Sequence, residues 1–152
     1  MKMSLLFSTP LVAALMLQST PPVPPMKMGL WEMTSTATVN GTNMLLHLPG
    51  LGNRTVKSRS CITPDTFQQA WSSLKGCTRD NVESGPKSFS YDLTCANGRS
   101  KIHFAMTFDT PVHGTYTMHS VSSSQTMDTK ADATFISSDC GSIEPGKPKM
   151  VK

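Results

Sequence analysis

The chain has 152 residues, 38% of them hydrophobic, and its 14 basic and 10 acidic residues give a formal net charge of +4. That length suits a single domain with a real core, and the mild excess of positive charge includes no clustered basic face of the kind that nucleic-acid-binding proteins carry. The composition therefore favours one globular domain and argues against a nucleic-acid-binding protein.

The first 20 residues have the pattern of a signal peptide. Lys2 precedes an apolar run from Leu5 to Leu17, which is shorter than the roughly 20 apolar residues that a membrane-spanning helix needs. We therefore predict a cleaved signal over residues 1–20, with a short uncleaved anchor as the alternative. Prolines dominate residues 21–27, and because proline lacks an N–H donor and favours extended geometry, this segment is predicted to be a spacer.

A single domain is predicted over residues 28–141, and most of it alternates between apolar and polar residues as β-strands do. Residues 29–39 form the first predicted strand, and the Asn-Gly pair at residues 40–41 indicates a tight turn into a second one. Residues 45–51 mix leucines with turn formers, which is typical either of a mobile apolar loop or lip or of a loop folded over the core. Residues 55–61 resume an extended pattern.

Residues 64–75 form the one convincing helix. Thr63 can cap it with its hydroxyl, and Pro64 fits the first helical position because a missing N–H loses no intrahelical hydrogen bond there. Phe67 and Trp71 lie four residues apart on one apolar face. We expect these two side chains to be core anchors that pack on a sheet rather than parts of a ligand site.

The chain after the helix predicts further strands, over residues 78–84, 88–96, 99–108, 115–123 and 130–139. A hairpin centred near Pro111 places Phe104 opposite Met118 and His103 opposite His119. That register gathers apolar side chains on one face, as a half-buried antiparallel sheet requires. The sequence therefore predicts an α+β, β-dominated fold, in which a curved antiparallel sheet of about six or seven strands carries the single helix.

The opposed pair His103 and His119 is the best candidate for chemistry, since directly opposed residues have Cβ atoms about 5 Å apart and two imidazoles could share a metal ion or a proton. A third ligand would have to come from an aspartate or a methionine, and no spacing demands one, so solvent-facing histidines are the simpler expectation. The sequence has no Gly-x-Ser-x-Gly elbow, phosphate loop or dinucleotide fingerprint. We therefore predict that the protein is not an enzyme and uses no cofactor.

Several short motifs resemble a known family. They are Gly29-Leu30-Trp31-Glu32, Arg59-Ser60-Cys61-Ile62-Thr63-Pro64, Cys77-Thr78, the strand ending in Cys95, and Ser138-Asp139-Cys140-Gly141 followed by Pro145. Together these motifs resemble the secreted bacterial domain-of-unknown-function family 3617, over nearly the whole mature chain. The resemblance implies export and a small, mostly β domain. Because the family has no assigned activity, the resemblance implies no functional residue.

All four cysteines follow the leader, which agrees with an oxidising, periplasmic or secreted location. The absence of a Cys-x-x-Cys pair disfavours structural zinc, so two disulfides are expected, with three possible pairings. A helix over residues 64–75 would be about 18 Å long. A disulfide needs a Cα separation of about 5.5 Å, which disfavours a bond between Cys61 and Cys77.

A turn at residues 85–87 instead sets Cys77 opposite Cys95, and the remaining pair is then Cys61 with Cys140. The same register places Phe89 beside a glutamate, so a bulge or a one-residue slip would have to intervene. The sequence thus predicts disulfides Cys77–Cys95 and Cys61–Cys140.

The leading functional hypothesis is an exported, non-catalytic domain that binds a small apolar ligand or a cell-envelope partner. It rests on the apolar face of the sheet and on the apolar loop over residues 45–51. The alternative is periplasmic copper or zinc binding through His103, His119 and methionines. The sequence predicts no stable membrane span after signal cleavage, and it predicts a flexible tail over residues 142–152.

Overall fold

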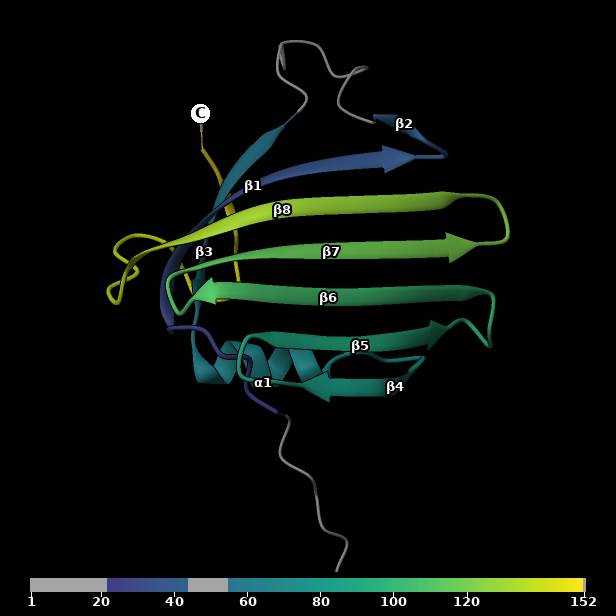
Figure 1. Ribbon diagram of the computed structural model, residues 1–152, viewed down its shortest axis with the longest axis horizontal. Coiled ribbons are helices and arrows are strands. Elements are labelled where there is room, and N and C mark those ends of the chain that lie inside the picture. The colour runs from purple at the N-terminus through teal and green to yellow at the C-terminus, as the bar shows by residue number, and fades with distance from the viewer. Residues whose placement is uncertain (1–21, 44–54, 152) are drawn as a thin grey trace, which may run out of the picture.

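The computed structural model of the protein describes residues 22–43 and 55–151 (Figure 1). The predicted signal peptide over residues 1–20 and the predicted apolar loop over residues 45–51 lie outside the described residues. The described part of the chain folds into one open antiparallel sheet with a single helix on it. No helix of that part is long and apolar enough to cross a membrane.

The strands of the sheet are β1 (Gly29–Val39), β2 (Thr42–Asn43), β3 (Val56–Ile62), β4 (Cys77–Ser84), β5 (Ser88–Cys95), β6 (Ser100–Thr110), β7 (His113–Ser122), β8 (Thr126–Ser137) and β9 (Lys149–Met150). Their order is β4-β5-β6-β7-β8-β1-β3-β9, and β2 pairs with β1 outside this path. Figure 1 shows β3 crossing the direction of β5 to β8 steeply, so the sheet curves at that end. The path holds more strands than the six or seven predicted. The sequence did not predict β9, because it has only two residues and shows no periodicity.

The hairpin of β6 and β7 confirms the predicted register, since Phe104 lies opposite Met118 and His103 lies opposite His119. Successive side chains of a strand point to opposite faces of the sheet. We therefore call the face that carries Phe104 the apolar face and the face that carries His103 the polar face. The pairing of β5 with β6 extends the apolar face to Tyr91, which lies opposite Phe104.

Helix α1 (Pro64–Ser72) lies against the apolar face, and Figure 1 shows it behind β4 and β5. Its predicted start is confirmed by a capping box. The backbone N–H of Thr66 donates to Oγ1 of Thr63 at 3.2 Å, and the backbone N–H of Thr63 donates to Oγ1 of Thr66 at 2.9 Å. The helix ends before the predicted residue 75, because the Ser72 hydroxyl donates to carbonyl groups one turn back and competes with further helical hydrogen bonds.

Trp31 anchors the core on the apolar face and is only 1% exposed. Its ring meets that of Phe135 edge-on at 5.7 Å between centroids, and its Nε1–H donates to the carbonyl of Lys27 at 2.9 Å. Gly29 lies beside a bulge in the pairing of β1 with β8 and has φ of +141°. A Cβ at Gly29 would overlap the carbonyl oxygen of Ser137, so the close approach of these two strands requires glycine.

A second apolar cluster lies on the opposite side of β1 and β3, where the C-terminal segment packs. Leu30, Cys61 and Ile143 are buried in it, and a disulfide joins Cys61 to Cys140. The sequence predicts a flexible tail over residues 142–152, whereas the structure places part of this segment along β3, with β9 paired to it. The difference arises because a buried isoleucine and a disulfide anchor a segment whose Pro, Gly and Lys content alone favours solvation.

The second disulfide joins Cys77 to Cys95, which lie directly opposite each other at one end of β4 and β5. Both disulfides therefore join the pairs that the sequence favoured. A bulge between Asp80 and Glu83 shifts the register toward the turn, which is the irregularity that the predicted pairing required. Since β4 is an edge strand, the bulge also interrupts the row of backbone groups that another chain could pair with.

Candidate apolar binding groove

A groove of about 340 Å³ runs between α1 and the apolar face of the sheet, and we call it the apolar groove. This volume falls in the range of small-molecule sites, about 300–1,000 Å³. Its described lining residues are Pro24, Met26, Ile62, Phe67, Ala70, Trp71, Leu74, Arg79, Phe89, Tyr91, Phe104 and Met106. At Met26, Ile62 and Met106 the groove meets a smaller cavity of about 30 Å³ beside Trp31. The groove therefore extends from the edge strand β4 toward the core at β1.

Five of the twelve described lining residues of the groove are aromatic. Trp71 of α1 lies 5.8 Å from Phe89 and 5.6 Å from Tyr91, measured between ring centroids. Tyr91 lies 5.0 Å from Phe104, which in turn lies 5.8 Å from Tyr116. Trp71 was predicted to be a core anchor, and it does contact the sheet, but it is only partly buried and lines the groove. The helix as a whole has no fully buried residue.

Arg79 is the only charged side chain among the described residues that line the groove. Its guanidinium carbon lies 3.5 Å from the ring centroid of Trp71, a cation–π contact, and its Nη2–H donates to the Trp71 carbonyl at 2.6 Å. Its Nε–H is buried without a hydrogen-bond partner among the described residues, and none of their carboxylates forms an ion pair with it. Desolvation by burial lowers the pKa of Arg79 from its ordinary value, and the facing Tyr91 acts in the opposite direction.

Residues 22–27, predicted to belong to a spacer, pack against the sheet and close the far end of the groove. Pro24 is buried, and the backbone N–H of Lys27 donates to the carbonyl of Pro111 at 3.1 Å. The same segment lines another hollow of about 400 Å³ beside Lys87 and Phe108. The walls of that hollow combine prolines with charged side chains, so it offers an apolar ligand less contact than the aromatic groove does.

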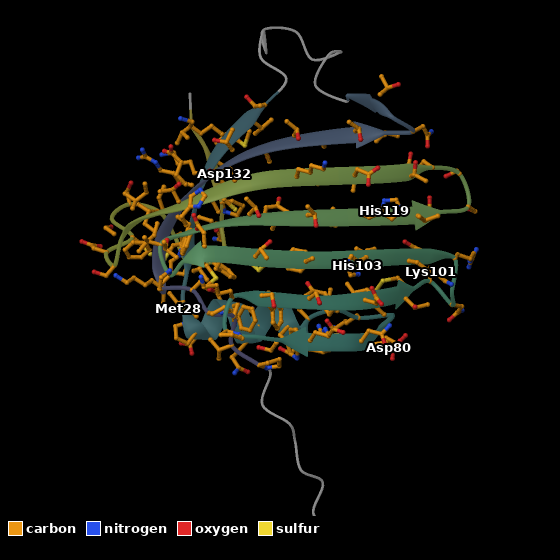
Figure 2. The ribbon with its side chains drawn as sticks, viewed as in Figure 1. Met28, Asp80, Lys101, His103, His119 and Asp132 are labelled. Atoms are coloured by element: carbon orange, nitrogen blue, oxygen red, sulfur yellow. A yellow bond between two sulfur atoms is a disulfide. The ribbon has the colours of Figure 1, made fainter. Side chains whose placement is uncertain are left out.

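The predicted pair His103 and His119 lies on the polar face, and Figure 2 labels both side chains on the neighbouring strands β6 and β7. The register adds Asp92 of β5 beside His103 and Asp128 of β8 beside His119. We call these four residues the histidine row. Nδ1 of His103 lies 2.7 Å from Oδ1 of Asp92, and Nδ1 of His119 lies 2.6 Å from Oδ1 of Asp128. Because an ionised carboxylate can only accept a hydrogen bond, each Nδ1–H donates a hydrogen bond to its aspartate.

Hydrogen bonds at one end of the histidine row keep Asp92 ionised. Asp92 accepts from Nδ2 of Asn81 at 2.7 Å as well as from His103. These hydrogen bonds, with that from Asn81 the larger, lower the pKa of Asp92 from its ordinary value. Asp92 is therefore ionised at neutral pH and holds the ring of His103 in a fixed orientation.

His113 has carboxylates at both ring nitrogens. Its Nδ1 lies 2.8 Å from Oδ1 of Asp109, and its Nε2 lies 3.0 Å from Oδ2 of Asp132. Hydrogen bonding to Asp109 contributes most to raising the pKa of His113, and Asp132 adds to it, because both carboxylates favour the imidazolium. His113 therefore differs from the histidine row, whose Nε2 atoms make no hydrogen bond to a described residue.

The structure separates the two kinds of metal ligand that the sequence suggested. His103 and His119 lie on the polar face, whereas Met106 and Met118 lie in phase with Phe104 on the apolar face. One ion cannot contact side chains on both faces, so this arrangement gives no support to a joint site of histidines and these methionines. Over residues 22–43 and 55–151, no group of three or more His, Cys, Asp or Glu side chains could hold a metal ion.

Sequence reasoning missed Arg79 as a site residue. The position of Arg79 could have been predicted, because the register of β4 with β5 places it opposite Leu93, among residues that point to the apolar face. An arginine in phase with buried residues has to find a partner or a ligand. The groove itself could not be predicted from the sequence, because its existence depends on the distance between α1 and the sheet.

The chain matches the model of a protein family that is described as a protein of unknown function (DUF3617), over residues 26–140. The matched span includes α1, the strands from β1 to β8 and all four cysteines of the two disulfides. No curated protein and no solved structure matches the chain.

Proposed function

The chain belongs to the DUF3617 family of unknown function, and we propose that it is an exported, non-catalytic domain that binds a small apolar ligand. Because the family membership assigns no activity, the proposal rests on the groove. The observation that carries the proposal is the aromatic groove between α1 and the sheet. Helix α1 leaves its apolar side chains only partly buried. A ligand that covers them would gain about 25 cal/mol for each Å² of apolar surface removed from water.

The residues around the groove favour binding over catalysis. Arg79, Tyr91 and the indole N–H of Trp71 are the only polar side-chain groups among its described lining residues. The histidines that could act as bases, His103 and His119, lie on the opposite face of the sheet. General acid–base and nucleophilic catalysis both need a base within hydrogen-bond reach of the reacting atoms, and the described lining offers none.

Two observations support export. The chain has two disulfides, Cys61–Cys140 and Cys77–Cys95, and disulfides of this structural kind persist in oxidising compartments. The described part of the chain also has a small core of eight buried hydrophobic residues, which fits a domain that relies on covalent links for part of its stability. A periplasmic or secreted location is therefore part of the proposal.

Binding of the neutral dye Nile red tests the proposed function. We expect its fluorescence to rise on addition of the protein, with energy transfer from Trp71. The Trp71→Ala variant should bind about thirtyfold more weakly, because truncating an aromatic anchor at a binding site costs about 2 kcal/mol or more. The matched control is Ile136→Ala, which removes a 47% exposed side chain that does not line the groove and should leave the affinity unchanged. Equal binding by the Trp71→Ala variant, or none by the unmodified protein, would refute the proposal.

A partner protein of the cell envelope is the other form of this hypothesis, since a partner could insert an apolar side chain into the same groove. Native mass spectrometry of the protein purified from the producing cell separates the two forms. A small added mass that organic solvent extracts supports the ligand, whereas an added protein chain supports the partner.

A second candidate function, weak binding of a divalent metal ion, is favoured by the histidine row. Asp92 and Asp128 accept from the Nδ1 atoms, so the Nε2 atoms of His103 and His119 carry lone pairs on adjacent strands. A carboxylate behind each imidazole is the arrangement that metal sites commonly use. Two protein ligands leave the other positions to water, so the affinity should be low.

Calorimetric titration with zinc or copper(II) tests this second candidate. His103→Ala should abolish the binding heat. His113→Ala should preserve it, because both ring nitrogens of His113 are already hydrogen-bonded to carboxylates. Binding that survives His103→Ala would show that the metal lies elsewhere.

A further inference from the structure

The apolar groove carries a charge that its apolar lining does not explain. Among the described lining residues, Arg79 alone is charged, and it is hydrogen-bonded only through Nη2, to the Trp71 carbonyl. Its Nε–H is a buried donor without a described partner. An unmatched buried donor is unfavourable. The rings of Trp71 and Tyr91 contact the guanidinium, but no carboxylate of a described residue forms an ion pair with it. The groove therefore presents a cation that has no counter-ion among the described residues.

The two ends of the groove differ in charge because Arg79 lies at only one of them. Arg79 belongs to β4, which is the edge strand of the sheet. The other end of the groove is lined by Met26, Ile62 and Met106 and meets the small cavity beside Trp31. Between these ends lie the rings of β5 and β6, with Tyr91 and Phe104 5.0 Å apart. The groove is thus cationic at the sheet edge and apolar toward the core.

We infer that the ligand of the groove, if the proposed function holds, is a single-chain amphiphile with a carboxylate head, of the fatty-acid type. The head contacts Arg79 at the sheet edge, and the alkyl chain lies over Tyr91 and Phe104 and ends near Met106. A guanidinium holds a carboxylate through parallel hydrogen bonds in a fixed planar geometry. A neutral head would leave the cation unpaired, and a cationic head would be repelled.

A purely structural role for Arg79 makes a different prediction. In that case its stacking on Trp71 and its hydrogen bond to the Trp71 carbonyl serve only to hold α1 against β4. The head group of a ligand would then not influence its affinity. A series of ligands with one chain length and different head groups distinguishes the two roles in the unmodified protein.

Displacement of Nile red by decanoate, decanol and decyltrimethylammonium provides that series. Decanoate should bind about ten- to a hundredfold more tightly than decanol, because a hydrogen bond to a charged group contributes about one to two powers of ten in affinity. Decyltrimethylammonium should bind most weakly. In Arg79→Met the ratio of the decanoate affinity to the decanol affinity should fall to about one, and Arg79→Lys should restore only part of that ratio.

The outcomes separate this inference from the proposed function on which it rests. If decanoate and decanol bind the unmodified protein equally, the groove binds apolar ligands but the inference about the head group is wrong. If the dye binds but none of the three displaces it, the inference is wrong and the proposed function stands. If the dye itself does not bind, both statements are wrong. Should Arg79→Met fail to fold, the series on the unmodified protein still decides the question.

Discussion

Replacing Trp31 with alanine is expected to lower the free energy of unfolding by about 3–5 kcal/mol, the usual result of truncating a buried aromatic side chain. Trp31 is 1% exposed and packs edge-on against Phe135. Its loss would leave a cavity beside β8 and would remove the donor to the Lys27 carbonyl. Because single domains are stable by only about 5–15 kcal/mol, this change alone should bring the protein close to unfolding. Urea denaturation followed by circular dichroism measures the loss.

The second tryptophan of the chain is the control for this experiment. Trp71 lies on α1, is only partly buried and lines the groove. Trp71→Ala should therefore cost clearly less stability than Trp31→Ala, while it weakens Nile red binding. If the two substitutions cost the same stability, then Trp71 is a core residue after all and the groove is not an open site.

Removing the disulfide between Cys61 and Cys140 is expected to destabilise the protein by about 4.5 kcal/mol, as the chain-entropy model predicts for cysteines 79 residues apart. This bond also holds the second apolar cluster together, since Cys61 is buried beside Leu30 and Ile143. The double variant Cys61→Ala/Cys140→Ala should therefore lose both the covalent link and the packing of the C-terminal segment. Guanidinium denaturation gives the change in free energy, and amide hydrogen exchange at β9 reports the release of the segment.

The disulfide that closes the shorter loop, Cys77–Cys95, provides the matched comparison. Cys77 and Cys95 are 18 residues apart, for which the same model gives about 3 kcal/mol. Cys77→Ala/Cys95→Ala should thus be the milder double variant and should leave the exchange rates at β9 unchanged. The reverse order of stability would mean that the C-terminal segment contributes little to the fold.

The strands and their register were predictable because each depends on a local and periodic pattern. The alternation along β6 and β7 correctly placed His103 opposite His119, since a shift by one residue would have exposed every apolar side chain of the hairpin. The pairing of Cys77 with Cys95 followed from the same kind of register. The start of α1 at Pro64 was equally local, because it rests on that proline and on the cap by Thr63.

The remaining features depend on contacts between distant segments, which a pattern does not encode. β9 has two residues, and its place along β3 follows from the disulfide of Cys140 and the burial of Ile143. The end of α1 was misplaced because serine hydroxyls near Ser72 compete for helix carbonyls. The apolar face was expected to be a site, but the contact of Arg79 with Trp71 became visible only when the helix was placed on the sheet.

The most direct test of the groove as a binding site is to locate a bound ligand on the protein. Nuclear Overhauser contacts between the methylene protons of decanoate and the protein's aromatic rings give that location. We predict contacts to Trp71, Tyr91 and Phe104, and none to Val121, which lies in phase with His119 on the polar face. Contacts confined to the polar face, or none at saturating decanoate, would contradict it.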